Sequence, residues 1–468
     1  MDASPDTDGP FAAPRALLVG LAATATIGLT ALAAGARGGP DDSGGSSPQS
    51  AVHRAESQAH TAAAVEHTLD KLEDETAETV ARAGKPFESL PVSLLPDNWA
   101  KVGLDSDKAE IQNGKYVQTL PSGLRVTFTL EPDLQQQIRE VYREYDVPHG
   151  GLAVVEPSTG RVRAMVSHSQ GRPRMPNLAR RATAPAASVF KMVTATALLE
   201  SGGIEPEDET CYRGGSSHLS AEHVKRRPEP PRNCRDLGDA LAWSINAIIA
   251  KLAYRHLDRA ELKRWAERFG FNESIPFDLP LEPSRAEIPA DPIERARTAA
   301  GFWHTYISPV HAATMAAAIA NDGLMMRPTL IEKVQSPEGE VLYDFEPRTL
   351  RRVMPAETAK TLADLLSRTT SKGTADSYFE HGRPFPDGVQ TAGKTGTLAR
   401  EDPYLSFTWF VGFGRMKGDS GSKAAAVAGL ACNRPQWRIK GPHVASTALR
   451  TYFSLLERGP DGALATTE

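Results

Sequence analysis

Apolar residues recur along this chain with two different periods, and these periods predict its secondary structure. Spacings of three and four residues are typical of amphipathic helices, whereas short apolar runs bounded by turn residues are typical of strands. The expected helices cover 131–145, 188–201, 239–256 with a break near residue 244, 262–269, 308–322, a stretch around 362–366, and 444–456. The expected strands cover 151–156, 161–167, 389–393, 407–414 and 424–431. We therefore expect an α+β fold: a five-stranded antiparallel sheet flanked by N- and C-terminal helices, with an inserted all-helical subdomain.

An uncharged stretch near the N-terminus predicts a membrane anchor. It runs from Ala16 to Ala36 between two arginines, Arg15 and Arg37, and about 20 apolar residues suffice to cross a bilayer. The alternative is a cleaved signal peptide, since Ala34-Gly35-Ala36 resembles a cleavage site. We favour an uncleaved transmembrane helix over 15–37, because the apolar run is longer than a usual signal-peptide core.

Composition divides the rest of the chain into a linker, one large domain and two tails. Residues 1–14 and 459–468 are expected to be disordered tails. Residues 38–115 begin with a Gly/Ser/Asp/Pro linker and continue as a partly helical stalk. The folded domain is expected to cover 116–458.

Composition also narrows the classes of partner. The chain has 468 residues, of which 40% are hydrophobic and 24% charged, and its net charge of −5 includes no long basic block. We therefore expect no nucleic-acid partner. Three isolated histidines, His218, His223 and His304, lack the spacing of metal ligands, so no metal and no cofactor is expected.

The chain has three cysteines. Cys211 and Cys234 bracket a Pro- and Arg-rich loop and form a candidate disulfide in an oxidising compartment. The alternative is that both are unrelated free thiols. Cys432 lies in an apolar run and is expected to be a core residue.

The strongest chemical signal is Ser188-Val189-Phe190-Lys191 at the start of an apolar helix. Residues three apart share a helix face, so Lys191 is expected beside Ser188. A serine hydroxyl needs a neighbouring base to become a nucleophile, and a lysine can be that base when burial lowers its pKa. A second match to this spacing, residues 420–423, lies in a Gly/Ser turn and we discard it.

Two further motifs complete a candidate site. Ser244 and Asn246 lie where a helical pattern breaks, so that they can orient a substrate amide and pass protons. A capping turn is the simpler explanation of that pair. Lys394-Thr395-Gly396-Thr397 follows a strand-like run, and its glycine lets a substrate backbone approach.

In this order, the three motifs resemble those of the penicillin-binding protein transpeptidases and their serine β-lactamase relatives, over about 116–458. The class B-like members of that family have the fold expected above. Further similar segments are 152–157 with 164–166, 308–323, Gly373-Thr374-Ala375 and 409–413. Two positions depart from the family pattern: Ala187 stands where the family often has glycine, and Gly301-Phe302-Trp303-His304 replaces a Gly-Gln-Gly segment. We expect Trp303 and His304 to pack rather than to narrow the cleft.

The resemblance implies a role for each catalytic residue. Ser188 attacks the penultimate D-Ala carbonyl of a peptidoglycan stem peptide, and Lys191 takes its proton. Ser244 and Lys394 relay a proton to the leaving D-Ala, while Asn246 contacts the substrate amide.

The resemblance also implies how substrate is bound. Backbone N–H groups of Ser188 and Thr397 form the oxyanion hole, and Thr395 and Thr397 hold the terminal carboxylate beside Gly396. An amine from a second stem peptide then resolves the acyl-enzyme as a cross-link, and β-lactam antibiotics trap the serine.

Other functions remain open at this point. A D,D-carboxypeptidase differs only in using water as acceptor. A β-lactamase is less well supported, because no glutamate is convincingly placed to activate water. A non-catalytic muropeptide or β-lactam receptor, or an inactive homologue, is a further alternative. The resemblance implies a single-pass protein of the bacterial cytoplasmic membrane with an extracytoplasmic catalytic domain and, as partners, other cell-wall synthesis proteins.

Overall fold

The computed structural model describes residues 96–170, 174–200, 203–215, 219–225, 233–418 and 423–458. The expected N-terminal tail (1–14), anchor (15–37) and C-terminal tail (459–468) lie outside these ranges, as does the linker up to residue 95. Among the helices described, none is both long and apolar enough to cross a membrane.

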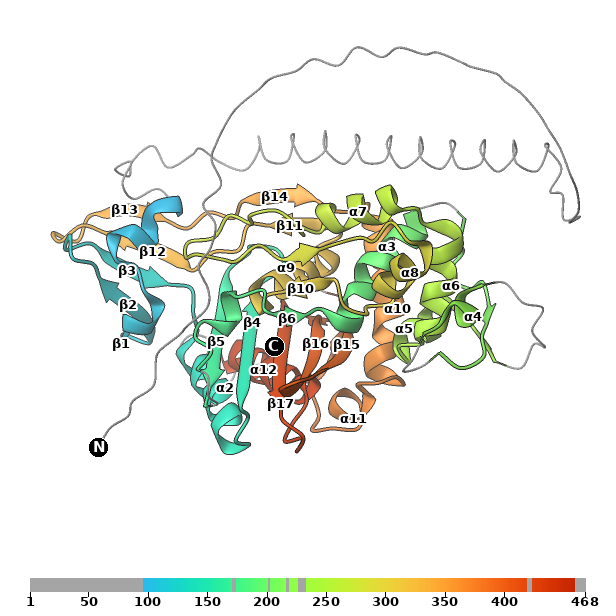
Figure 1. Cartoon of the computed structure of the whole chain (residues 1–468). Coiled ribbons are helices and arrows are strands. Elements are labelled where there is room, and N and C mark those ends of the chain that lie inside the picture. The colour runs from blue at the N-terminus through green and yellow to red at the C-terminus, as the bar shows by residue number, and fades with distance from the viewer. Residues whose placement is uncertain are drawn as a thin grey trace, which may run out of the picture. The chain divides into compact units, whose positions relative to one another are not determined.

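A five-stranded antiparallel sheet forms the centre of the fold, so the predicted α+β architecture with antiparallel strands is confirmed (Figure 1). The strand order is β15-β16-β17-β4-β5, which leaves β15 at one edge. Long apolar runs in β16 and β17 are buried on both faces, which is why they read as continuous rather than alternating patterns. The strands are β4 (His149–Val155), β5 (Val162–Ser169), β15 (Val389–Glu401), β16 (Tyr404–Met416) and β17 (Ala424–Asn433).

Helices cover both faces of this sheet. On one face, α2 (Pro132–Glu144) and α12 (Gly441–Arg458) pack together and enclose one apolar cluster with the strands. On the other face, α9 (Pro309–Ala320) is buried along its whole length within a second, larger cluster. Ser308 caps α9 by accepting a hydrogen bond from the His311 N–H, as its Ser-Pro start predicts.

The inserted helical region packs beside the sheet, towards the end at which β15 lies (Figure 1). Its main helices are α3 (Lys191–Glu200), α4 (Ala221–Val224), α5 (Leu237–Ala242), α6 (Asn246–His256), α7 (Arg259–Arg268) and α8 (Pro292–Ala299); α10 (Ala356–Ser371) and α11 (Asp376–Phe379) follow later in the chain. Side chains cap several of these helices: Asp236, Asp258 and Asp291 accept hydrogen bonds from backbone N–H groups at the starts of α5, α7 and α8, and the sequence patterns did not predict α4 or α8.

A second five-stranded sheet, in the order β1-β2-β3-β12-β13, was not predicted. It begins before Tyr116, and a 3₁₀ helix over Pro96–Val102 precedes it. Its strands are β1 (Glu110–Gln112), β2 (Lys115–Thr119), β3 (Arg125–Phe128), β12 (Ile331–Gln335) and β13 (Val341–Asp344). Three smaller sheets contain β6 (Ala184–Pro185), β9 (Arg285–Ala286) and β10 (Thr305–Ile307); β7 (Thr210–Cys211) and β8 (Cys234–Arg235); β11 (Leu324–Met326) and β14 (Thr349–Arg352).

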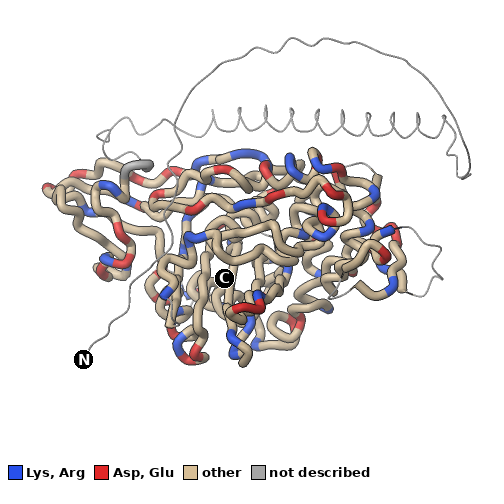
Figure 2. The backbone as a smooth tube through the Cα atoms, viewed as in Figure 1, with Lys and Arg blue, Asp and Glu red and all other residues tan. Residues whose placement is uncertain are grey.

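Charged residues are mixed along the described chain. Figure 2 shows lysine and arginine interspersed with aspartate and glutamate over both sheets and the helical region. This distribution does not resemble the one-sided basic face of a nucleic-acid-binding protein.

Cys211 and Cys234 lie opposite each other on β7 and β8, and a disulfide joins them. Cys432 is buried in the core on β17. The backbone carbonyl of Cys211 also accepts a hydrogen bond from the buried Lys251 ammonium at 2.8 Å, so the bridge is tied to α6.

Replacing both Cys211 and Cys234 by serine is expected to lower the free energy of unfolding by about 2–4 kcal/mol, because the bridge restricts the unfolded chain. Chemical denaturation measures the loss, with wild-type protein under reductant as the control. Alkylation of the unreduced, denatured wild type should label Cys432 alone. Labelling of all three cysteines would contradict the bridge.

Candidate active site

Ser188 lies in a 3₁₀ turn (Ala187–Phe190) that leads directly into α3. The sequence predicted an α-helix beginning at Ser188; the structure instead starts α3 at Lys191 and ends it at Glu200. In a 3₁₀ turn, residues i and i+3 eclipse each other more closely than in an α-helix. The Lys191 Nζ and Ser188 Oγ are accordingly 2.7 Å apart.

Lys191 is fully buried and makes three hydrogen bonds. Besides Ser188, its Nζ donates to Asn246 Oδ1 at 2.7 Å and to the Ala300 carbonyl at 2.6 Å. Burial, and then the nearby charge of Lys394, hold the pKa of Lys191 well below its usual value. A neutral amine has two N–H donors and one lone pair, so the two acceptors take its hydrogens and the lone pair faces the Ser188 hydroxyl. This is the arrangement of a base poised to deprotonate a serine.

Ser244 occupies a special backbone position between α5 and α6. Its N–H donates to the Leu241 carbonyl, the Ile245 N–H donates to Ala240, and Ser244 has a φ of 56°. These bonds form a Schellman cap, in which glycine usually takes the left-handed position. A serine there costs about 1–3 kcal/mol of strain and places a hydroxyl in the cleft. Ser244 therefore belongs to a capping turn and also lines the cleft, so the two interpretations of this motif do not exclude each other.

Lys394 lies on the edge strand β15, which runs beside the Ser188 turn. Its Nζ donates to the Thr395 carbonyl at 3.0 Å, and burial lowers its pKa to about 7. A Cβ at Gly396 would lie 3.2 Å from the Ala186 carbonyl. Glycine therefore lets β15 approach the nucleophile closely.

A cleft of about 360 Å³ brings these motifs together. Of the predicted site residues, six line the cleft, Lys191 and Lys394 are buried side chains, and the two disulfide cysteines do not line it. The six are Ser188, Ser244, Asn246, Thr395, Gly396 and Thr397.

Five further lining residues had no assigned role in the sequence-based site. Thr374 and Trp409 belong to segments that the sequence did single out, and the Thr374 hydroxyl hydrogen-bonds that of Thr395 at 2.6 Å. The others are Thr408, Lys440 and Pro442. A lysine in an exposed loop carries no distinctive sequence signal, so Lys440 was missed.

The segment that replaces the usual Gly-Gln-Gly motif supports the nucleophile. Gly301 has a φ of 93°, and a Cβ there would lie 2.3 Å from the Ala187 carbonyl and 2.8 Å from the Ser188 N–H nitrogen. The Trp303 side chain is 37% exposed, contrary to the expected packing, whereas His304 is partly buried. Neither residue lines the cleft, in line with the expectation that they would not narrow it. Ala187 itself has a φ of 50°, which accounts for glycine being suited to that position.

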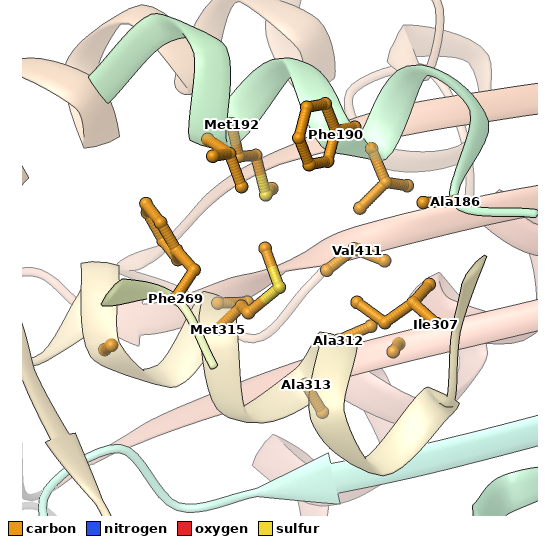
Figure 3. Packing of buried hydrophobic residues seen from close by; sticks show 14 of the residues in the cluster. Ala186, Phe190, Met192, Phe269, Ile307, Ala312, Ala313, Met315 and Val411 are labelled. Carbon is orange, nitrogen blue, oxygen red and sulfur yellow. The ribbon is translucent and has the colours of Figure 1, made fainter. Parts of the chain in front are cut away.

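The core behind the nucleophile is tightly packed. In Figure 3, Met192 of α3 and Met315 of α9 point towards one another, with Phe269 beside them and Val411 of β16 below Phe190. All five side chains are buried. The Ser188 turn itself packs against β15 and β16 of the sheet.

Of the three histidines considered as metal ligands, two lie within the described residues. His223 closes a capping box with Ser220, and His304 follows Trp303, whereas His218 lies outside the description. Among described residues, no group of three His, Cys, Asp or Glu side chains is arranged to hold a metal ion.

Together these features define a class of site: a serine nucleophile, a buried lysine base and a second lysine on an adjacent edge strand, which suits acyl transfer through a covalent intermediate. The chain belongs to the family described as penicillin binding protein transpeptidase domain, whose model matches residues 150–421.

Curated relatives support the family assignment. The chain is 28% identical over 330 residues to the peptidoglycan D,D-transpeptidase PbpA of Mycolicibacterium smegmatis, covering 63% of this chain and 65% of that protein. It is 26% identical over 329 residues to PbpA of Mycobacterium tuberculosis, with the same two coverages. The chain thus spans somewhat less than two thirds of the length of these relatives.

Solved structures share the fold. A D,D-transpeptidase domain from Eggerthella lenta matches with a TM-score of 0.59 at 23% identity, over 73% of this chain and 86% of that one. PBPA from Mycobacterium tuberculosis matches with a TM-score of 0.57 at 22% identity, over 70% and 80% respectively.

Replacing Gly301 by alanine is expected to slow acylation of Ser188 by about tenfold to a hundredfold, because the new methyl group displaces the nucleophile's backbone. The second-order rate of labelling with a fluorescent penicillin measures this.

Gly339→Ala is the matched control, since Gly339 has a φ of 92° but nothing within 4 Å of the new Cβ. It should lose stability through backbone strain and keep the wild-type labelling rate. Equal labelling rates in both variants would contradict the inference that close packing of Gly301 holds the Ser188 backbone in place.

Proposed function

We propose that this chain is a class B-like peptidoglycan D,D-transpeptidase that cross-links stem peptides through an acyl-enzyme on Ser188. The observation that carries the proposal is the hydrogen-bonded set at Lys191, which joins the serine of the first motif to the amide of the second. PbpA relatives named as peptidoglycan D,D-transpeptidases support it.

In acylation, the Ser188 hydroxyl gives its proton to the Lys191 amine as Oγ attacks the penultimate D-Ala carbonyl. The peptide bond to the terminal D-Ala then breaks, and its nitrogen receives a proton relayed through Ser244 and Lys394. Asn246 holds the substrate amide beside Ser188. The pKa shift of Lys191 favours its role, because burial and the nearby charge of Lys394 lower its pKa and so favour the neutral amine.

The developing oxyanion is bound by the N–H groups of Ser188 and Thr397. The close approach of Gly396 to the Ser188 turn supports this pairing. One such donor can contribute about 10²–10³ in rate. An acceptor amine from a second stem peptide then attacks the ester, releases Ser188 and completes the cross-link.

We also propose that the chain is anchored in the bacterial cytoplasmic membrane through residues 15–37, with its catalytic domain on the extracytoplasmic side. The uncharged stretch supports the anchor. The Cys211–Cys234 bridge supports an oxidising compartment. Other cell-wall synthesis proteins are the expected partners at that surface.

β-Lactams are the proposed inhibitors. Penicillin-binding protein A of Mycobacterium tuberculosis, which shares this fold, has been solved as acyl-enzyme complexes with ceftriaxone and with penicillin G. The Ser188 Oγ would attack the lactam carbonyl as it attacks the penultimate D-Ala carbonyl.

Incubation with a fluorescent penicillin is expected to label the wild type stably and to leave Ser188→Ala unlabelled. Thermal unfolding of the variant controls for loss of structure. A folded wild type that takes no label would contradict the assignment of Ser188 as nucleophile.

Product analysis separates the transpeptidase from the carboxypeptidase. Stem pentapeptide with an amine acceptor is expected to yield cross-linked dimer and one released D-Ala per dimer, as measured by mass spectrometry. Tetrapeptide without dimer would assign a D,D-carboxypeptidase instead.

The rate of acylation is expected to follow a bell-shaped pH profile. It rises with pH as Lys191 loses its proton and becomes a base, and falls near pH 7 as Lys394, whose pKa burial lowers to about 7, loses the proton it must supply. Burial and then the charge of Lys394 lower the pKa of Lys191, which favours its basic form. In Lys394→Gln, slower overall, the falling limb should disappear; a wild-type rate that keeps rising to pH 9 would contradict these roles.

A further inference from the structure

The loop between β17 and α12 borders the cleft and is held in place by one buried side chain. Asn433 accepts a hydrogen bond from the Arg438 N–H at 3.0 Å and donates one to the Ile439 carbonyl at 2.9 Å. Asn433 is fully buried, and Ile439 is nearly so. The next residue, Lys440, therefore leaves the loop at a fixed position, and it lines the cleft.

The start of α12 fixes Lys440 against the substrate strand. The Gly441 N–H donates to Thr408 Oγ1 at 3.1 Å, and Thr408 lies directly opposite Thr397 in the β15–β16 register. Opposed residues of an antiparallel pair project from the same face of a sheet, and Thr395 shares that face with Thr397 because side chains alternate. Lys440 thus adjoins the face that carries both threonine hydroxyls.

Lys440 differs from the other two lysines of the site. Its side chain is exposed, and its Nζ lies 4.9 Å from the centre of the Trp437 ring, a cation–π contact that restrains it. Among described residues, no carboxylate forms an ion pair with it. Lys191 and Lys394, in contrast, are fully buried.

We propose that Lys440 is the cationic partner of the substrate's terminal carboxylate, and that it sets the preference of this site for a free carboxylate over a neutral C-terminal group. This inference rests on the proposed function and extends it to a specificity-determining residue outside the three motifs.

The charge of the cleft supports the assignment. Burial lowers the pKa of Lys394 to about 7 and that of Lys191 well below its usual value, so burial disfavours the charged form of both amines. The threonine hydroxyls supply hydrogen bonds but no charge. A carboxylate beside Thr395 and Thr397 therefore finds its compensating charge at Lys440.

The test compares benzylpenicillin, whose carboxylate stands in for that of D-Ala, with its neutral methyl ester. The ratio of their second-order acylation rates at Ser188 is measured by intact mass spectrometry for wild type, Lys440→Gln, Lys440→Arg and Arg438→Gln. Loss of a charge-assisted hydrogen bond should lower the ratio about tenfold to a hundredfold in Lys440→Gln.

Lys440→Arg should retain most of the ratio because it keeps the charge. Arg438→Gln removes an exposed charge from the same loop at a position that does not line the cleft. This variant should also retain most of the ratio of acylation rates. Thermal unfolding checks that each variant is folded.

An unchanged ratio in Lys440→Gln, or an equal fall in Arg438→Gln, would overturn the assignment while leaving acylation of Ser188 intact. If the wild type reacts with neither compound at Ser188, the proposed function fails and this inference fails with it.

Discussion

The buried amine of Lys191 is the interaction on which the rest of the site depends. Its three partners come from different parts of the chain: Ser188 from the turn before α3, Asn246 from the first turn of α6, and the Ala300 carbonyl from the end of α8. A buried lysine with an unmet partner would cost several kcal/mol. The positions of three elements relative to one another are therefore coupled to the protonation state of a single nitrogen.

Several residues with strained backbone conformations lie in the segments around this amine. Four non-glycine residues with positive φ lie in the site's own segments: Ala187, Ser244, Trp303 and His304. Such conformations cost about 1–3 kcal/mol each and persist only when surrounding contacts enforce them. Here the enforcing contacts are visible in the Schellman bonds at Ser244 and in the packing of Gly301 on the Ser188 turn. At Ser244, stability is thus given up where a hydroxyl enters the cleft.

Much of this arrangement could be predicted from the sequence, because its motifs coincide with strong periodic patterns. The five strands of the central sheet and the helix break before Asn246 produce clear changes of period. The second sheet could not be predicted, since β3 pairs with β12 across about two hundred residues and both are short. Pairing of distant short strands leaves no local pattern.

Two parts of the site, the Ala300 carbonyl and Lys440, could not be predicted from the sequence for a different reason. The Ala300 carbonyl is a backbone group, which every residue type has, so the sequence does not indicate its role. Lys440 is an ordinary exposed lysine until the Asn433 hydrogen bonds and the Gly441–Thr408 contact fix its place. Sequence motifs identify groups that must be of one type, whereas backbone acceptors and loop charges gain their roles from tertiary position alone.

The edge position of β15 follows from the same demands. An unpaired strand edge is usually a liability that proteins cover or shorten, yet β15 pairs with β16 alone and presents its other side to the Ser188 turn. A partner strand there would close the cleft that Thr395, Gly396 and Thr397 line. Gly396 allows the strand to lie against the nucleophile without such a partner. The free edge and the glycine therefore act together, because both keep the side of β15 that faces Ser188 open to a substrate.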